Sequence, residues 1–271
     1  GIYAVLAAFF FIMTYKWTKE RVKPLMEKSS VKKDLKDLAK NGQWFIMLGA
    51  GIAVLIFNSL RDGSIMYYFK YFVHDQTLPV FGDVKWDKLA GAYLTVWLVT
   101  NLLGVLLAKP ASAKFGKKST FIGAMVIASI FSFIFYWIDP NDVGIIFGLN
   151  IIIGLSAGIV LPLIWSMYAD IADYSEWKTG RRATGLVFSS SSMSQKMGWT
   201  LGGAITGWLL YAYGFEANAE QTTESLKGIR LLISVYPAIG ALLSAFVLLI
   251  YKLSDSFMET IISDLEARRP E

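Results

Sequence analysis

The sequence has 271 residues, of which 55% are apolar, 15% aromatic and 17% charged. This composition is too apolar for an ordinary soluble domain, and the apolar residues fall in runs of about 20, the length of helix that crosses a bilayer. The net charge is +5, and the basic residues are concentrated in a few segments, which favours a role in membrane topology over nucleic-acid binding. The sequence contains no cysteine, which excludes disulfide and thiol chemistry.

Apolar runs alternate with short polar segments along the chain, which predicts an all-α polytopic membrane protein. The sequence starts at Gly1 inside an apolar run, without an initiating Met, so we expect residues 1–15 to be the end of a helix that begins upstream, in a missing N-terminal part. A transmembrane bundle is expected over residues 43–252, followed by a mixed-charge tail at 253–271. The expected helices of the bundle cover about 43–73, 89–108, 119–138, 143–173, 184–213 and 228–252.

Residues 16–42 link the first apolar run to the bundle and are strongly basic. Val31, Leu35 and Leu38 recur there at helical spacing, which predicts a short amphipathic helix along a membrane surface. A solvated basic linker would have the same composition, and both interpretations stay open.

The distribution of basic residues predicts the orientation of the bundle. Segments 16–40, 109–118 and 178–182 are rich in lysine and arginine, whereas the intervening loops are acidic or poor in basic residues. Basic loops remain on the cytoplasmic side of a membrane. The alternation therefore places the linker, residues 178–182 and the C-terminal tail in the cytoplasm.

Lys196 is a charged residue deep inside an apolar span. It lies roughly 15–21 Å along its helix, near mid-membrane, where insertion scales assign a lysine a cost of about 2.5–3.5 kcal/mol. Helical spacing places Ser189, Ser192, Trp199 and Thr200 on or beside its face. One interpretation is a residue on a substrate or ion pathway, and the other is a structural ion pair with a carboxylate on a neighbouring helix.

A second charged pair, Arg61 and Asp62, lies in the first complete span, one turn after Asn58. Its side chains could exchange hydrogen bonds with the hydroxyl groups of a substrate such as a sugar, or could bind each other or a neighbouring helix. Indole rings such as Trp165 and Trp199 stack on the apolar faces of sugars, but most aromatic residues of membrane helices serve packing or line the interface.

A dense block of charge at residues 169–185 separates two apolar spans. Asp170, Asp173 and Glu176 follow one another at one-turn spacing. The candidate partners are Arg181 and Arg182 in the same block and the lysines of segment 109–118. Such pairs form a gate if they exist in one conformation and break in another, although solvated interfacial charge has the same pattern. No enzyme, nucleotide-binding or metal-binding motif is present, so neither catalytic nor metal-ligating residues are expected.

The block reads Ala-Asp-Ile-Ala-Asp-Tyr-Ser-Glu-Trp-Lys-Thr-Gly-Arg-Arg-Ala-Thr-Gly, and Gln195-Lys196 with several glycines follows it. This motif and its spacing resemble those of the glycoside–pentoside–hexuronide:cation symporters, the melibiose-permease-like branch of the major facilitator superfamily. The basic segment 108–118 resembles the superfamily's loop between helices eight and nine. The resemblance covers nearly the whole sequence, as the end of transmembrane helix six followed by the six-helix C-terminal bundle.

The resemblance implies a cation-coupled sugar symporter that works by alternating access. Lys196 matches the lysine that links the sugar and cation sites in the family. Leu161 stands where melibiose-type members carry a sugar-facing tryptophan, and Trp165 lies one turn further on. This departure from the melibiose-type pattern favours another glycoside, a pentoside or a hexuronide as the substrate. The pathway residues expected are Lys196, Arg61, Asp62, Asn58, Trp165, Trp199 and Gln195. The gate residues expected are Asp170, Asp173, Glu176 and Arg182.

The expected partners are a sugar, the lipid bilayer and the N-terminal half of the same transporter, with no nucleic acid. No cofactor is expected beyond a coupling cation, Na⁺ or H⁺, whose main site would lie in the N-terminal half. The expected location is the bacterial inner membrane, with multiple spans and a cytoplasmic C-terminus. A lysolipid or other amphiphile symporter of the same branch is the alternative, followed by a non-transporting membrane scaffold or sensor.

Overall fold

The computed structural model describes residues 1–18, 31–180 and 184–268, which divide into two units at residues 31 and 32. The first unit contains α1 (Ile2–Trp17), an apolar helix that buries no residue within its own unit. The second unit is a helical bundle with one small hairpin. The α2 helix begins at Val31, the last residue of the first unit, and continues into the second. From there the elements in chain order are α2 (Val31–Ala39), α3 (Gly42–Tyr68), the π-helical turn η1 (Phe69–Val73), β1 (Gln76–Leu78), β2 (Gly82–Val84), α4 (Trp86–Phe115), α5 (Lys117–Ile134), the 3₁₀ turn η2 (Phe135–Trp137), α6 (Val143–Thr179), α7 (Thr184–Ala212), α8 (Thr223–Ile233), α9 (Val235–Leu249) and α10 (Asp255–Arg268).

Five helical segments of the described chain are long and apolar enough to cross a membrane. They are Gly42–Val73, Trp86–Phe115, Lys117–Trp137, Val143–Thr179 and Thr223–Leu249. The sequence predicted six complete spans. The sixth expected span corresponds to α7, which has the required length but is interrupted by a run of serines, Gln195 and Lys196, so that its composition is less apolar. The chain is therefore an all-α, multi-pass membrane protein whose α7 is unusually polar.

Several element boundaries differ from those expected. The α4 helix continues through Pro110 to Phe115, where the sequence suggested a loop, and α6 continues past residue 173 to Thr179. The last span starts at Thr223, whose neighbour Thr222 caps the helix, and it is divided into α8 and α9 at Ser234. Residues 76–84, expected as loop, form the β1–β2 hairpin.

Helix caps and close crossings hold the bundle together. Asn41 begins α3 by accepting hydrogen bonds from the first free N–H groups. The backbones of α4 and α6 cross so closely that a Cβ atom on Gly158 would lie 2.2 Å from the carbonyl oxygen of Asn101. A Cβ atom on Gly202 of α7 would lie 2.4 Å from the side chain of Ser59 in α3. Only glycine permits such contact between helices.

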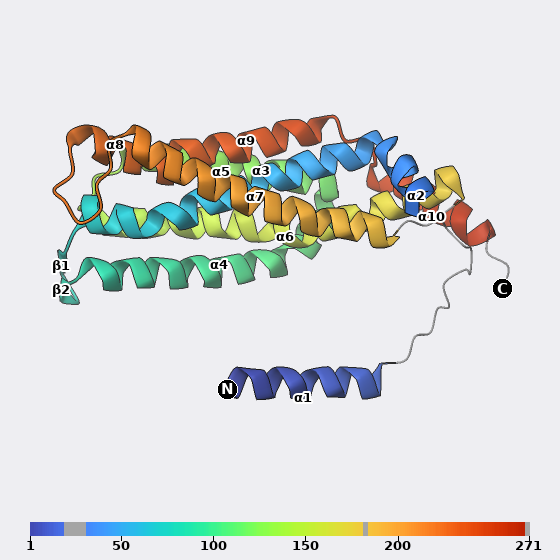
Figure 1. Ribbon diagram of the computed structural model, residues 1–271, viewed down its shortest axis with the longest axis horizontal. Coiled ribbons are helices and arrows are strands. Elements are labelled where there is room, and N and C mark those ends of the chain that lie inside the picture. The colour runs from blue at the N-terminus through green and yellow to red at the C-terminus, as the bar shows by residue number, and fades with distance from the viewer. Residues whose placement is uncertain (19–30, 181–183, 269–271) are drawn as a thin grey trace. The chain divides into compact units, whose positions relative to one another are not determined.

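The two ends of the bundle carry different elements (Figure 1). The hairpin and the starts of α4 and α6 lie at one end, which we call the hairpin end. At the other, the tail end, α2 and α10 lie beside the last turns of α6. Trp177 of α6 donates its indole N–H to Asp264 of α10 at 2.9 Å, and Arg268 donates to the Trp177 carbonyl oxygen. These contacts attach the C-terminal helix to the bundle.

Candidate functional site

One face of α7 is polar and open. Ser189, Ser192, Lys196, Trp199 and Thr200 are all exposed along it, and the hydroxyl groups of both serines are bonded back to their own helix. Among the described residues, no carboxylate forms an ion pair with Lys196. The structural pair considered for this lysine is thus not found in the described part of the chain. A lysine in mid-helix is costly against hydrocarbon, so this face is suited to a polar cavity or to another polar surface.

The α6 helix contributes an aromatic ring beside this face. Trp165 is 41% exposed and stacks on Phe188 of α7, with an interplanar angle of 17° and ring centroids 6.1 Å apart. Leu161, one turn before it, is also exposed, and Gln195 lies half-buried next to Lys196. An exposed indole ring that packs nearly parallel to a second aromatic ring can stack on the apolar face of a sugar.

Arg61 lies inside the bundle and not on an open face, because its side chain is 1% exposed. Its guanidinium donates to the Tyr93 hydroxyl at 2.6 Å and to the Ile233 carbonyl oxygen at 3.0 Å, and it lies over the ring of Trp97. Pro237, four residues after Ile233, has no N–H to bond that carbonyl group. Arg61 therefore joins α3 to α4 and completes the hydrogen bonding of the α8–α9 break. These contacts fit the structural alternative for Arg61.

Asp62 and Asn58 lie one turn apart on α3, and both are half-buried. The Oδ1 atom of Asp62 is buried and has no hydrogen-bond partner among the described residues. A buried carboxylate oxygen without a donor is unfavourable. Asp62 thus has an unused acceptor, whereas the donors of its neighbour Arg61 are engaged in holding helices together.

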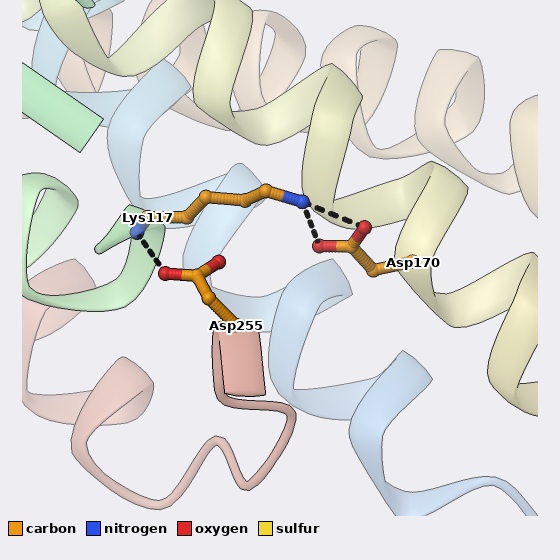
Figure 2. Close-up of polar contacts among 3 residues, drawn as sticks. All are labelled: Lys117, Asp170 and Asp255. Carbon is orange, nitrogen blue, oxygen red and sulfur yellow. Dashed lines mark hydrogen bonds and ion pairs between the residues drawn. The ribbon is translucent and has the colours of Figure 1, made fainter. Parts of the chain in front are cut away.

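The charged groups at the tail end form a compact cluster (Figure 2). The Lys117 ammonium group, at the start of α5, lies 2.7 Å from both carboxylate oxygens of Asp170 in α6. The backbone N–H of Lys117 donates to Asp255 Oδ2 at 2.9 Å, so the first residue of α10 caps α5. Gly116, with φ of 80°, permits this approach, since a Cβ atom there would lie 2.7 Å from the same oxygen. Lys117 and Asp255 thus connect α5, α6 and α10.

Two of the other expected gate residues lie on the same helix as Asp170. Asp173 and Glu176 follow Asp170 on α6, and neither is without an interaction partner. Arg182 lies outside the described residues. Burial is the main cause that raises the pKa of the Tyr251 phenol beside this cluster, and Asp170 and Asp255 raise it further. Tyr251 therefore stays neutral and does not add charge to the cluster.

The sequence named Lys117 and Asp170 among the candidate gate charges, but it did not identify Asp255. Asp255 is an ordinary helix-start residue in sequence, and its bond to α5 spans 138 positions. Within the described ranges, no group of three or more His, Asp or Glu side chains is arranged to hold a metal ion. The site thus consists of the open α7 face with Trp165, the unused Asp62 oxygen and the tail-end cluster.

Comparison with known proteins decides the family. Residues 1–255 match the family described as MFS/sugar transport protein. The chain belongs to this family. Members of the family are membrane transporters and not enzymes, and membership accounts for the run of membrane-length helices. The fold is accordingly an all-α, multi-pass membrane fold of the major facilitator superfamily.

Individual relatives are similar over the whole chain. The isoprimeverose transporter of Lactiplantibacillus pentosus is 34% identical over 100% of this chain and 54% of its own length. A putative glycoside/cation symporter of Escherichia coli (strain K12) is 32% identical over 93% of the chain and 53% of its own length. A glucuronide carrier protein homolog of the same strain is 27% identical over 99% of the chain and 56% of its own length. The chain thus spans about half the length of the curated relatives that it matches.

Proposed function

We propose that this chain is the C-terminal half of a cation-coupled sugar symporter that works by alternating access. The substrate is a glycoside, a pentoside or a hexuronide, as the names of the relatives suggest. The coupling cation is Na⁺ or H⁺, with its main site in the N-terminal half of the transporter. Transport then requires both halves.

The observation that carries the proposal is the position of Lys196. It lies about 18 Å along a helix of about 44 Å, near mid-membrane, on the open polar face of α7. An ammonium group at that depth needs water, a substrate or an opposing acidic group. A pathway between two halves of a symporter supplies all three. The match of Lys196 to the lysine that links sugar and cation sites in this symporter family supports the same assignment.

The neighbouring residues take complementary roles. Trp165 provides an aromatic surface for one face of the sugar ring, while Trp199 and Gln195 border Lys196 on α7. Asn58 and Asp62 of α3 accept or donate hydrogen bonds to hydroxyl groups, since Asp62 has an unused oxygen. Arg61 is assigned to positioning, because its donors are occupied inside the bundle.

The tail-end cluster acts as the cytoplasmic gate region. Asp170 is held by Lys117 inside this half, and Asp173, Glu176 and Arg182 provide charge for pairs that change partners when the two halves move. Within the second unit, the described basic stretches 32–40, 109–118 and 178–180 lie toward this end of the bundle, which supports a cytoplasmic tail end and C-terminus. The membrane is the bacterial inner membrane.

Transport by the full-length protein in sealed vesicles tests this proposal. Labelled glycosides, pentosides and hexuronides are offered with and without an inward Na⁺ or proton gradient. We expect one sugar class to accumulate above its external concentration, and only with one of the gradients. Uptake of lysolipid with no uptake of sugar would support the amphiphile alternative. Sugar binding without flux in either direction would support a scaffold or sensor.

A further inference from the structure

A second candidate binding site lies at the hairpin end, away from Lys196 and the tail-end cluster. It is a cavity of about 610 Å³ between the β1–β2 hairpin, the start of α4 and the start of α6. Small-molecule sites in proteins typically have volumes of about 300–1,000 Å³. The hairpin forms one wall with Leu78 and Val84, α4 forms another with Leu89 and Ala92, and Phe147 of α6 contributes an aromatic ring.

The chemistry of the cavity differs from that of the open α7 face. Its lining is almost entirely apolar, and Lys88 is the one charged residue among those that line it. An apolar wall offers a sugar no hydrogen bonds, so the cavity is unsuited to the transported substrate. It suits a hydrocarbon chain whose polar end lies near Lys88, and the ammonium group of Lys88 complements a negatively charged group there.

The position of the cavity indicates which hydrocarbon chain is available. The cavity includes the first turns of two membrane-spanning segments, which begin at Trp86 and at Val143. The ends of such long helices reach the headgroup region of a bilayer, whose apolar core is only about 30 Å thick. The hairpin tip adds two exposed apolar side chains, Val80 at 84% and Phe81 at 77%. Apolar residues exposed at this level are suited to contact with lipid and not with water.

We propose that this cavity binds one acyl chain of a glycerophospholipid from the adjoining leaflet, with the lipid phosphate beside Lys88. The hairpin covers the chain, and Val80 and Phe81 extend the contact into the surrounding lipid. This site is independent of the sugar pathway, since none of its lining residues belongs to the open α7 face.

The test uses the full-length protein in vesicles of phosphatidylethanolamine and phosphatidylglycerol that contain a phospholipid with a diazirine on one acyl chain. After irradiation, mass spectrometry locates the lipid adducts. We expect adducts to concentrate in residues 78–92 and 143–147 above the level of other lipid-facing segments. Ala92→Trp should fill the cavity and reduce the number of these adducts by about fourfold or more. Loss of contact with a single methylene group of the acyl chain already lowers the affinity by about fourfold.

Two controls make the result decisive. Thr95→Trp places the same ring on an exposed position of α4 outside the cavity lining, and it should leave the adducts unchanged. A diacylglycerol with the same diazirine chain but no phosphate should label the cavity less than the phospholipid does, and Lys88→Gln should remove that difference. Equal labelling in Ala92→Trp and Thr95→Trp, or adducts no more frequent than elsewhere, would overturn the proposal. So would a photocrosslink showing that the N-terminal half fills the cavity.

Discussion

Arg61 gives the sharpest test of how the bundle is held together. The substitution Arg61→Met removes the donors of two short hydrogen bonds to buried acceptors, the Tyr93 hydroxyl and the Ile233 carbonyl oxygen, and of a longer contact of 3.5 Å to the Ser132 hydroxyl. A buried acceptor left without a partner costs about 1–3 kcal/mol, so two of them lower the free energy of unfolding by roughly 2–6 kcal/mol. Removing a buried guanidinium also releases its own desolvation cost, which offsets part of this loss.

A double-mutant cycle with Pro237 isolates the contribution of one hydrogen bond. Pro237→Ala introduces an N–H four residues after Ile233, where a continuous helix would bond that carbonyl group. Arg61→Met should then destabilise the Pro237→Ala background less than it destabilises the wild type, by about 1–3 kcal/mol. The desolvation term of Arg61 is common to both backgrounds and cancels from this difference.

The assay is unfolding of the purified full-length protein by SDS in mixed micelles. Pro110→Ala is the matched control, because Pro110 lies about 20 Å along α4 from Trp97, which contacts Arg61. Its effect should add to that of Arg61→Met within about 0.5 kcal/mol. Additive effects of Arg61→Met and Pro237→Ala would refute the proposed pairing. A stable Arg61→Met protein that no longer binds sugar would place Arg61 in the pathway.

Three further predictions concern packing, the gate and the substrate. Gly158→Ala should destabilise the bundle by about 1–3 kcal/mol, whereas Gly148→Ala on the same helix, with open space at its Cβ position, should change SDS unfolding by less than about 0.5 kcal/mol. Lys117→Gln and Asp170→Asn should each slow uptake and lower the free energy of unfolding. The double variant should lose less unfolding free energy than the sum of the two single losses, because neither charge is left unpaired. Strictly additive losses would contradict this pairing. Trp165→Ala should raise the KM for sugar by about 2- to 12-fold while Trp165→Phe largely preserves it, because ring stacking contributes about 0.5–1.5 kcal/mol; an unchanged KM in Trp165→Ala would remove that residue from the pathway.

The sequence predicted the helical architecture because membrane helices leave a direct record in long apolar runs. It also predicted the polar face of α7, since the positions of Ser189, Ser192 and Trp199 relative to Lys196 follow from helical geometry alone. The structure leaves these side chains exposed. Whether they line the sugar pathway remains a prediction.

The contacts of Arg61 and Asp255 could not be predicted in this way. The partners of Arg61 lie 32 and 172 residues away in sequence, and Asp255 reaches Lys117 across 138 residues. No local pattern encodes such pairs, because they depend on how the helices pack. The same is true of Pro110, which the sequence suggested as part of a loop although α4 continues through it.

The most direct test of the central claim is gradient-driven sugar uptake by the full-length protein carrying Lys196→Gln. The matched control is Lys85→Gln, which alters an exposed lysine just before α4 that makes no ion pair among the described residues. Both proteins are first shown to be folded and present in the vesicles in equal amounts. We predict that Lys196→Gln loses accumulation of the sugar while Lys85→Gln retains it. Equal accumulation by both variants would contradict the assignment of Lys196 to the substrate and cation pathway.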